Sequence, residues 1–203
     1  MPRFFTPPNQ LTLLRILLTP VFVSLFLSPQ PSFRLWSIPI FIAGMLTDWY
    51  DGWVARRWGF ITRWGSHFDP IADKVFISAA FFSFVFQGLV PAWTVWVIVF
   101  RDVGITFLRS YSELKGVTFS TSKSAKVKTF VQFTALYYIL VTSVGSTALP
   151  AGSPYQLFFD EISSAVFRAW LMGFTALLTL ASGFQYLYSN RSFLLTLNDN
   201  KHS

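Results

Sequence analysis

Four aspartates in the first half of the chain are the residues best suited to chemistry. Asp48 and Asp51 are three positions apart and Asp69 and Asp73 are four apart, so each pair shares one face of a helix. Both pairs border apolar runs, where an ionised side chain is costly and needs a partner. Converging carboxylates repel one another, and a hard divalent cation removes that repulsion. We therefore expect the four aspartates to bind Mg²⁺ or Mn²⁺.

The stretch between the two pairs has features of a phosphate site. Gly52 and Ala55 follow Asp48 by four and seven positions, so the face that carries the first acid pair is also small. Small residues let a ligand approach the backbone closely. Arg56 comes next, and a guanidinium can bind phosphate oxygens in a bidentate manner. A single acid pair at a helix end is often only solvated, but two pairs flanking one short basic loop favour a site for a metal and a diphosphate.

The amino-acid composition indicates that the chain is a membrane protein rather than a soluble one. Hydrophobic residues make up 53% of the 203 positions and charged residues only 12%, against about 25% charged in soluble domains. The chain has no cysteine, which excludes disulfides, thiolate nucleophiles and Cys-ligated zinc. Its two histidines, His67 and His202, argue against a multi-histidine site. In an integral membrane protein, the net charge of +7 indicates basic cytoplasmic loops and phosphate-bearing partners rather than nucleic acid.

The apolar segments predict the fold class. A membrane-spanning helix needs about 20 mainly apolar residues, and basic and non-basic connections alternate along the chain. The positive-inside rule then places both termini and the aspartates on the cytoplasmic side. We expect one all-α integral membrane domain over residues 1–203, in a bacterial cytoplasmic membrane, with its active site facing the cytoplasm. Its six transmembrane helices are predicted at Leu11–Ser28, Phe33–Arg56, Pro70–Leu89, Pro91–Tyr111, Ala125–Val144 and Ala165–Tyr188.

Local signals refine this outline. Asp69 followed by Pro70 has the pattern of a helix N-cap and a first-turn proline, which predicts a helix start at that point. Tryptophans near span ends are expected to anchor the protein at the membrane interface; they are Trp36, Trp93 and Trp170.

Cations near the cytoplasmic ends of the later spans are candidates for binding an acceptor phosphate. Arg109, Lys126 and Lys128 have this position. The alternative for the lysines is that they only determine topology. Arg101 lies deeper in its apolar run, so pairing with a carboxylate is an alternative to substrate binding.

The aspartate region resembles a known family. Residues 48–56 read D-W-Y-D-G-W-V-A-R, and after eight residues the chain continues G-S-H-F-D-P-I-A-D to position 73. This is similar to the signature of the CDP-alcohol phosphotransferases, D-x-x-D-G-x-x-A-R followed by G-x-x-x-D-x-x-x-D. The start at Pro8–Arg15 and the run Lys126–Thr129 also resemble the phosphatidylglycerophosphate synthase branch. Asp102 stands where many of those enzymes have Glu, and cardiolipin synthases of the same family tend to have Asp there.

The resemblance implies an activity and a role for each matching residue. It implies transfer of a phosphatidyl group from CDP-diacylglycerol to sn-glycerol 3-phosphate, giving phosphatidylglycerophosphate and CMP, by a homodimer in the CDP-alcohol phosphotransferase fold. Asp73 would be the general base as well as a metal ligand. The other implied residues are the metal ligands Asp48, Asp51 and Asp69, the cytidine contacts Gly52 and Ala55, the diphosphate ligand Arg56, and Gly65, which allows close approach near the nucleotide.

Other activities compete with this interpretation. Within the family, a cardiolipin synthase or an inositol-phosphate transferase would use another acceptor. Outside it, a membrane transporter would also carry intramembrane acids and arginines. The sequence shows no inverted repeat of the kind found in many transporters, which favours an enzyme.

Overall fold

The computed structural model describes residues 7–58, 65–115 and 123–191, and within these ranges it describes all side chains except those of 7–9, 11, 48–58, 65–70, 114 and 123. The regular secondary structure of the described residues is entirely helical, as the apolar segments predict. The helices are α1 (Pro7–Phe26), α2 (Pro31–Trp58), α3 (Gly65–Phe86), α4 (Ala92–Leu114), α5 (Lys123–Ala148), α6 (Pro154–Ile162) and α7 (Ala165–Ser189).

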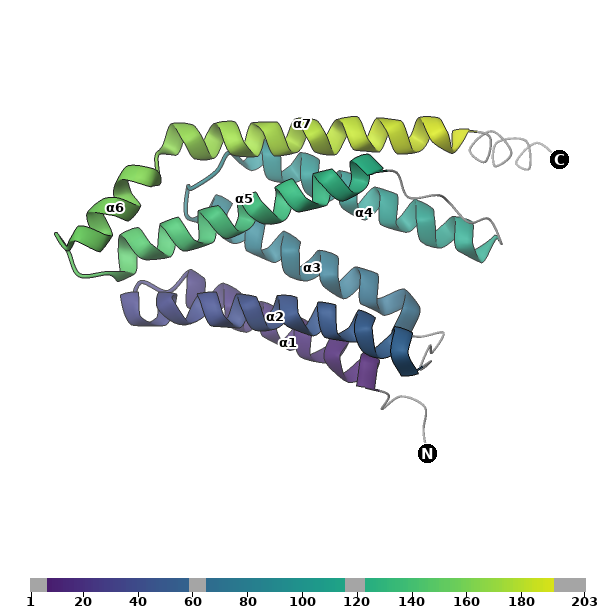
Figure 1. Cartoon of the computed structure of the whole chain (residues 1–203), viewed down its shortest axis with the longest axis horizontal. Helices are drawn as coiled ribbons and strands as arrows, with labels where there is room; N and C mark the ends of the chain where they lie inside the picture. The colour runs from purple at the N-terminus through teal and green to yellow at the C-terminus, as the bar shows by residue number, and fades with distance from the viewer. Residues whose placement is uncertain (1–6, 59–64, 116–122, 192–203) are drawn as a thin grey trace.

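The six long helices form a bundle in which the chain direction alternates from one helix to the next (Figure 1). α2 ends and α3 begins at one end of the bundle, which we call the aspartate end. α1 and α5 also begin there, and α4 and α7 end there. The short helix α6 lies at the opposite end, called the far end, where it joins α5 to α7. α1 packs on α2 and α3, α4 packs on α3 and α7, and α5 contacts α2, α6 and α7.

Each predicted span corresponds to one long helix, and two local expectations are wrong. α3 begins at Gly65, so Asp69 lies inside the helix and is not its N-cap. Pro70 has no backbone N–H, so α3 lacks one hydrogen-bond donor near its start, but the helix continues beyond this position. The predicted spans Ala125–Val144 and Ala165–Tyr188 leave residues 145–164 as a connection, but this region contains the last turn of α5 and the additional helix α6.

A phenylalanine-rich core holds α1, α2 and α3 together. Phe22, Phe41 and Phe76 are fully buried, and the rings of Phe41 and Phe76 stack with their centroids 5.3 Å apart. The Phe76 ring fits because position 44 is glycine: a Cβ atom on Gly44 would lie 2.4 Å from Phe76 Cζ. Gly44 is one turn before Asp48 on α2. This contact therefore sets the spacing of the two helices that carry the aspartate pairs.

The outside of the bundle is also apolar. Large side chains such as Phe86, Phe130 and Phe184 are at least 70% exposed, which is unusual for a protein surrounded by water. Ser124–Ala148 and Ala165–Ser189 are long and apolar enough to cross a membrane, on length and composition alone. The surface thus fits association with a lipid bilayer.

Two arginines toward the far end bind backbone carbonyl groups. Arg34 Nε donates to the carbonyl of Phe26, at the C-terminus of α1, with an N–O distance of 3.0 Å. Arg168 Nε donates to the carbonyl of Leu89, just beyond α3, at 3.1 Å. Cations are favourable at helix C-termini, so both arginines have a structural role. They lie toward the far end, where the connections between helices lack basic residues.

Candidate active site

The four aspartates of the sequence motif lie on helix ends that meet at the aspartate end (Figure 1). Asp48 and Asp51 are in the C-terminal part of α2, and Asp69 and Asp73 are in the N-terminal part of α3. The backbone thus brings the two motif halves to the same end of the bundle. The side chains of Asp48, Asp51, Asp69, Gly52, Ala55, Arg56 and Gly65 lie outside the described residues.

Asp73 is the one predicted ligand whose side chain is described. Its side chain is 19% exposed, and Oδ2 lies 3.3 Å from Lys74 Nζ. A carboxylate that is partly buried yet accessible can accept a proton or bind a cation. Among the described side chains, which include Asp73 but not the other three aspartates, no group of three or more potential ligands gathers. The donor set of the motif consists of carboxylate oxygens, which fits a hard ion such as Mg²⁺ or Mn²⁺.

A buried ion pair lies between α4 and α5. Asp102 on α4 is 7% exposed and Lys128 on α5 is 4% exposed. Lys128 Nζ lies 2.5 Å from one carboxylate oxygen of Asp102 and 2.6 Å from the other. Removing either partner of such a pair leaves an uncompensated buried charge. The pair therefore fixes the relative positions of α4 and α5 near the aspartate end.

Arg101 connects this ion pair to α7. Its Nη1 lies 3.2 Å from Asp102 Oδ1, and its Nη2 donates to the Ser182 hydroxyl at 3.0 Å. Of the two alternatives for Arg101, the structure shows the pairing with a carboxylate. Gly183 makes room for the arginine stem, because a Cβ atom there would lie 3.2 Å from Arg101 Cγ. Sequence reasoning missed Ser182, since a serine within an apolar helix commonly bonds only to its own backbone.

Lys74 links this group to Asp73. Besides contacting Asp73, Lys74 interacts electrostatically with Asp102 and Lys128. We call Lys74, Arg101, Asp102 and Lys128 the basic cluster. Among the described side chains, the three cations of this cluster and the carboxylates of Asp102 and Asp73 sum to one positive charge. A partly buried positive excess beside a general-base candidate attracts an anion.

The three residues predicted to bind an acceptor phosphate have different environments. Lys128 belongs to the basic cluster. Arg109 is about half exposed, and its Nε lies 3.0 Å from Glu113 Oε1, one turn further along α4. Lys126 is exposed at the start of α5. An exposed pair such as Arg109–Glu113 is weak, so Arg109 could exchange Glu113 for another anion at little cost.

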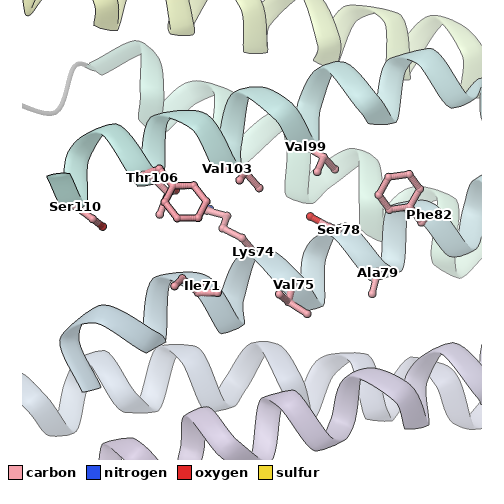
Figure 2. Close-up of a pocket in the computed structure, with 11 residues that line it drawn as sticks. Ile71, Lys74, Val75, Ser78, Ala79, Phe82, Val99, Val103, Thr106 and Ser110 are labelled. Carbon is pink, nitrogen blue, oxygen red and sulfur yellow. The ribbon is translucent and has the colours of Figure 1, made fainter. Parts of the chain in front are cut away.

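A cavity of about 600 Å³ lies between α3 and α4 (Figure 2). Lys74 and Ser78 point from α3 toward α4 across this space. Among the described residues that line it, Lys74 carries the charge and most others are apolar, so the cavity suits hydrocarbon with a polar group at the Lys74 end. The lining residues are Ile71, Lys74, Val75, Ser78, Ala79, Phe82, Val99, Val103, Thr106, Phe107 and Ser110.

Comparison with known proteins identifies the family. Residues 5–181 match CDP-alcohol phosphatidyltransferase. A relative in Bacillus subtilis (strain 168), named CDP-diacylglycerol–glycerol-3-phosphate 3-phosphatidyltransferase, is 33% identical over 96% of this chain and 100% of its own length. A protein of the same name in Shigella flexneri serotype 5b is 32% identical over 94% of this chain and 98% of its own. A probable phosphatidylglycerophosphate synthase of Mycobacterium tuberculosis is 34% identical over 88% of this chain and 78% of its own. Because the match extends over most of the chain and includes the aspartate motif, the chain belongs to the CDP-alcohol phosphatidyltransferase family.

Proposed function

We propose that this protein transfers a phosphatidyl group from CDP-diacylglycerol to sn-glycerol 3-phosphate, giving phosphatidylglycerophosphate and releasing CMP. Relatives over nearly the full length carry the name of this reaction. The structural observation that carries the proposal is the position of Asp73, a carboxylate of the family motif, beside the positive excess of the basic cluster. This arrangement supports a hydroxyl-activating base next to a site for a phosphorylated acceptor.

The motif residues would bind the nucleotide half of the donor. Mg²⁺ or Mn²⁺, when bound, neutralises the phosphoryl oxygens. Asp48, Asp51, Asp69 and Asp73 would hold the metal. Arg56 would pair with the diphosphate, while Gly52, Ala55 and Gly65 would leave room for the nucleotide.

Asp73 would accept the proton of the acceptor hydroxyl. As the proton moves to the carboxylate, the hydroxyl oxygen forms a bond to the β-phosphorus of CDP-diacylglycerol. The bond between that phosphorus and the bridging oxygen breaks, and CMP leaves with the oxygen. A general base must lie within hydrogen-bond reach of the proton it takes, so the acceptor hydroxyl would bind next to Asp73.

The acceptor phosphate would bind on the basic side of Asp73. Lys128 is the strongest candidate because it lies in the basic cluster, and it could share its donors between Asp102 and a phosphate. Arg109 and Lys126 are exposed on the adjoining helices. They would attract the anionic acceptor and complete its site when it binds.

We further propose six membrane spans with both termini and the aspartate end in the cytoplasm, and a homodimer. The apolar outer surface and the alternating helix directions support the spans (Figure 1). The native chain has no cysteine, so single-cysteine variants in its loops can be labelled without background. A membrane-impermeant maleimide applied to spheroplasts and to inverted vesicles would report the side of each loop, and light scattering in detergent would report the oligomeric state.

An acceptor panel tests the proposed reaction. Purified protein receives CDP-diacylglycerol and Mg²⁺, and CMP release is followed with glycerol 3-phosphate, phosphatidylglycerol, inositol phosphate or no acceptor. Release that depends on glycerol 3-phosphate supports the proposal. Release with phosphatidylglycerol alone would identify a cardiolipin synthase, and release with inositol phosphate alone would replace the acceptor. A protein that binds the substrates and releases no CMP would fit a transporter instead.

A further inference from the structure

Helix α6 is distinct from the six long helices in length, position and surface. It spans nine residues, Pro154–Ile162, and lies at the far end of the bundle (Figure 1). Its start is well defined, because Ser153 accepts a hydrogen bond from the Gln156 backbone N–H at 3.2 Å and a proline follows at the first helical position. None of its residues is buried. A short helix with no buried residue needs contacts beyond those within its own turns.

Specific contacts hold α6 against α5. The Phe159 ring lies where a side chain at Gly145 would be, since a Cβ atom there would come within 2.5 Å of the ring. The hydroxyl of Tyr138, also on α5, donates to the carbonyl of Ile162 at the end of α6. These contacts attach one side of α6 to the bundle and determine which sides point outward.

The two flanks beside this attached side differ in chemistry. Tyr155 and Phe158 are three residues apart, share one flank, and are 74% and 56% exposed. Gln156 and Asp160 are four residues apart and share the opposite flank; the Gln156 amide donates to the Ser146 carbonyl of α5 and accepts from the Gly152 N–H, and Asp160 is exposed. One flank of α6 is therefore aromatic and the other is polar, which is the pattern of a helix that lies along a membrane surface.

Three exposed tryptophans lie on helices that start at the far end (Figure 1). Trp36, Trp93 and Trp170 lie near the starts of α2, α4 and α7, and they are 63%, 59% and 75% exposed. All three helices start at the end of the bundle that holds α6 (Figure 1). Tryptophan and tyrosine concentrate where a bilayer meets water, so this belt marks the level of the interface next to α6.

We infer that α6 is an interfacial helix that inserts its Tyr155–Phe158 flank into the lipid headgroup region on the side of the membrane opposite the aspartate end. α6 carries no lysine or arginine and has two acids, Asp160 and Glu161. Its lipid contact is thus aromatic rather than electrostatic, and insertion needs no anionic lipid. This inference rests on the proposed membrane-spanning arrangement.

Spin labels on single cysteines test the inference separately from the spanning arrangement. Phe158→Cys and Asp160→Cys place labels on the two flanks of α6, and Leu177→Cys places one on an exposed site in the middle of α7. The labelled full-length protein is reconstituted in phosphatidylcholine vesicles, and label accessibility to oxygen and to a nickel chelate is measured. We expect the label at position 158 to be more accessible to oxygen and less accessible to the nickel chelate than the label at position 160. The label at position 177 should have the lowest nickel accessibility of the three. The same values are expected after phosphatidylglycerol is added to the vesicles.

The outcomes separate the two claims. Equal nickel accessibility at positions 158 and 160, with position 177 protected, overturns the interfacial role of α6 and leaves the spans intact. High nickel accessibility at position 177 overturns both the membrane-spanning arrangement and the interfacial role of α6. If the label at position 158 shifts toward oxygen accessibility only after phosphatidylglycerol is added, the lipid contact depends on anionic lipid, and the inference of an aromatic contact is wrong.

A second variant tests how α6 is held. Gly145→Leu should displace Phe159 and raise the mobility of the label at position 158. Gly173→Leu is the matched control, because a Cβ atom at Gly173 has no atom within 4 Å. Unchanged label mobility in Gly145→Leu would contradict the described attachment.

Discussion

Gly44→Ala is the sharpest test of how the fold positions the aspartates. The added Cβ would lie 2.4 Å from Phe76 Cζ and 2.8 Å from Cε1, whereas carbon atoms in contact prefer about 3.5–4.0 Å. Phe76 is fully buried and stacked on Phe41, so its ring has little freedom to retreat. The substitution should therefore push α2 and α3 apart by roughly 1 Å, given that preferred separation.

The expected cost follows from this clash. Overpacking a core typically costs about 1–3 kcal/mol, and the short distance at Gly44 favours the upper part of that range. Alanine in a helix recovers at most about 1 kcal/mol relative to glycine. A net loss of about 2 kcal/mol would lower Tm by roughly 4–8 °C for a chain of this size. Because the clash lies one turn from Asp48, a misplacement near 1 Å should also lower kcat/KM by about 100-fold.

Thermal unfolding in detergent and CMP release measure the two effects. Gly173→Ala is the control, since it makes the same chemical change on a helix where nothing contacts the new atom. Phe76→Leu added to Gly44→Ala should return part of the lost Tm by removing the ring. Wild-type Tm and kcat/KM in Gly44→Ala would refute the argument that this contact sets the spacing of the aspartate helices.

Four further predictions concern the site itself. Exhaustive chelation should abolish CMP release and added Mg²⁺ or Mn²⁺ should restore it; full turnover without metal would remove the metal from the mechanism. Asp73→Asn should abolish transfer with Tm close to that of the wild type, and normal turnover would exclude Asp73 as the base. Lys128→Gln should raise KM for glycerol 3-phosphate by about 10-fold or more, the loss expected for a charge-assisted hydrogen bond, and should also lower Tm because Asp102 keeps only Arg101 as a partner; with Lys126→Gln as the exposed control, equal effects on KM would place the acceptor elsewhere. Asp102→Asn should lower the free energy of unfolding by about 3–5 kcal/mol because it leaves Lys128 buried without its anion, and a small change in Tm would contradict that pairing.

Several features of the fold could be predicted because they depend on local sequence. Apolar runs long enough to span a bilayer predict the six long helices, and helical spacing predicts a shared face for each aspartate pair. Trp36, Trp93 and Trp170 are exposed, as an interfacial anchor must be, and their place at the membrane interface stays a prediction. The helix α6 was missed because its nine residues are far fewer than a membrane span needs.

Near the site, too, some contacts could be predicted from the sequence and others depend on how the helices pack. The position of Arg101 deep in an apolar run indicated a carboxylate partner as one of two alternatives, because a lone charge there is costly. Lys126 and Lys128 are two positions apart and look equivalent in sequence, yet one is exposed and the other is 4% exposed. Two positions on a helix are about 200° apart, so which lysine faces Asp102 depends on how α5 is rotated against α4.

The sequence alone determined the helical class, the apolar surface and the family, because composition, periodicity and motif spacing are properties of the chain itself. Tertiary structure alone decided that Lys128 pairs with Asp102, that Arg101 reaches Ser182, and that Gly44 receives the Phe76 ring. These contacts join residues on different helices or depend on helix rotation. Their geometry follows from the packing of whole helices, which no local pattern in the sequence encodes.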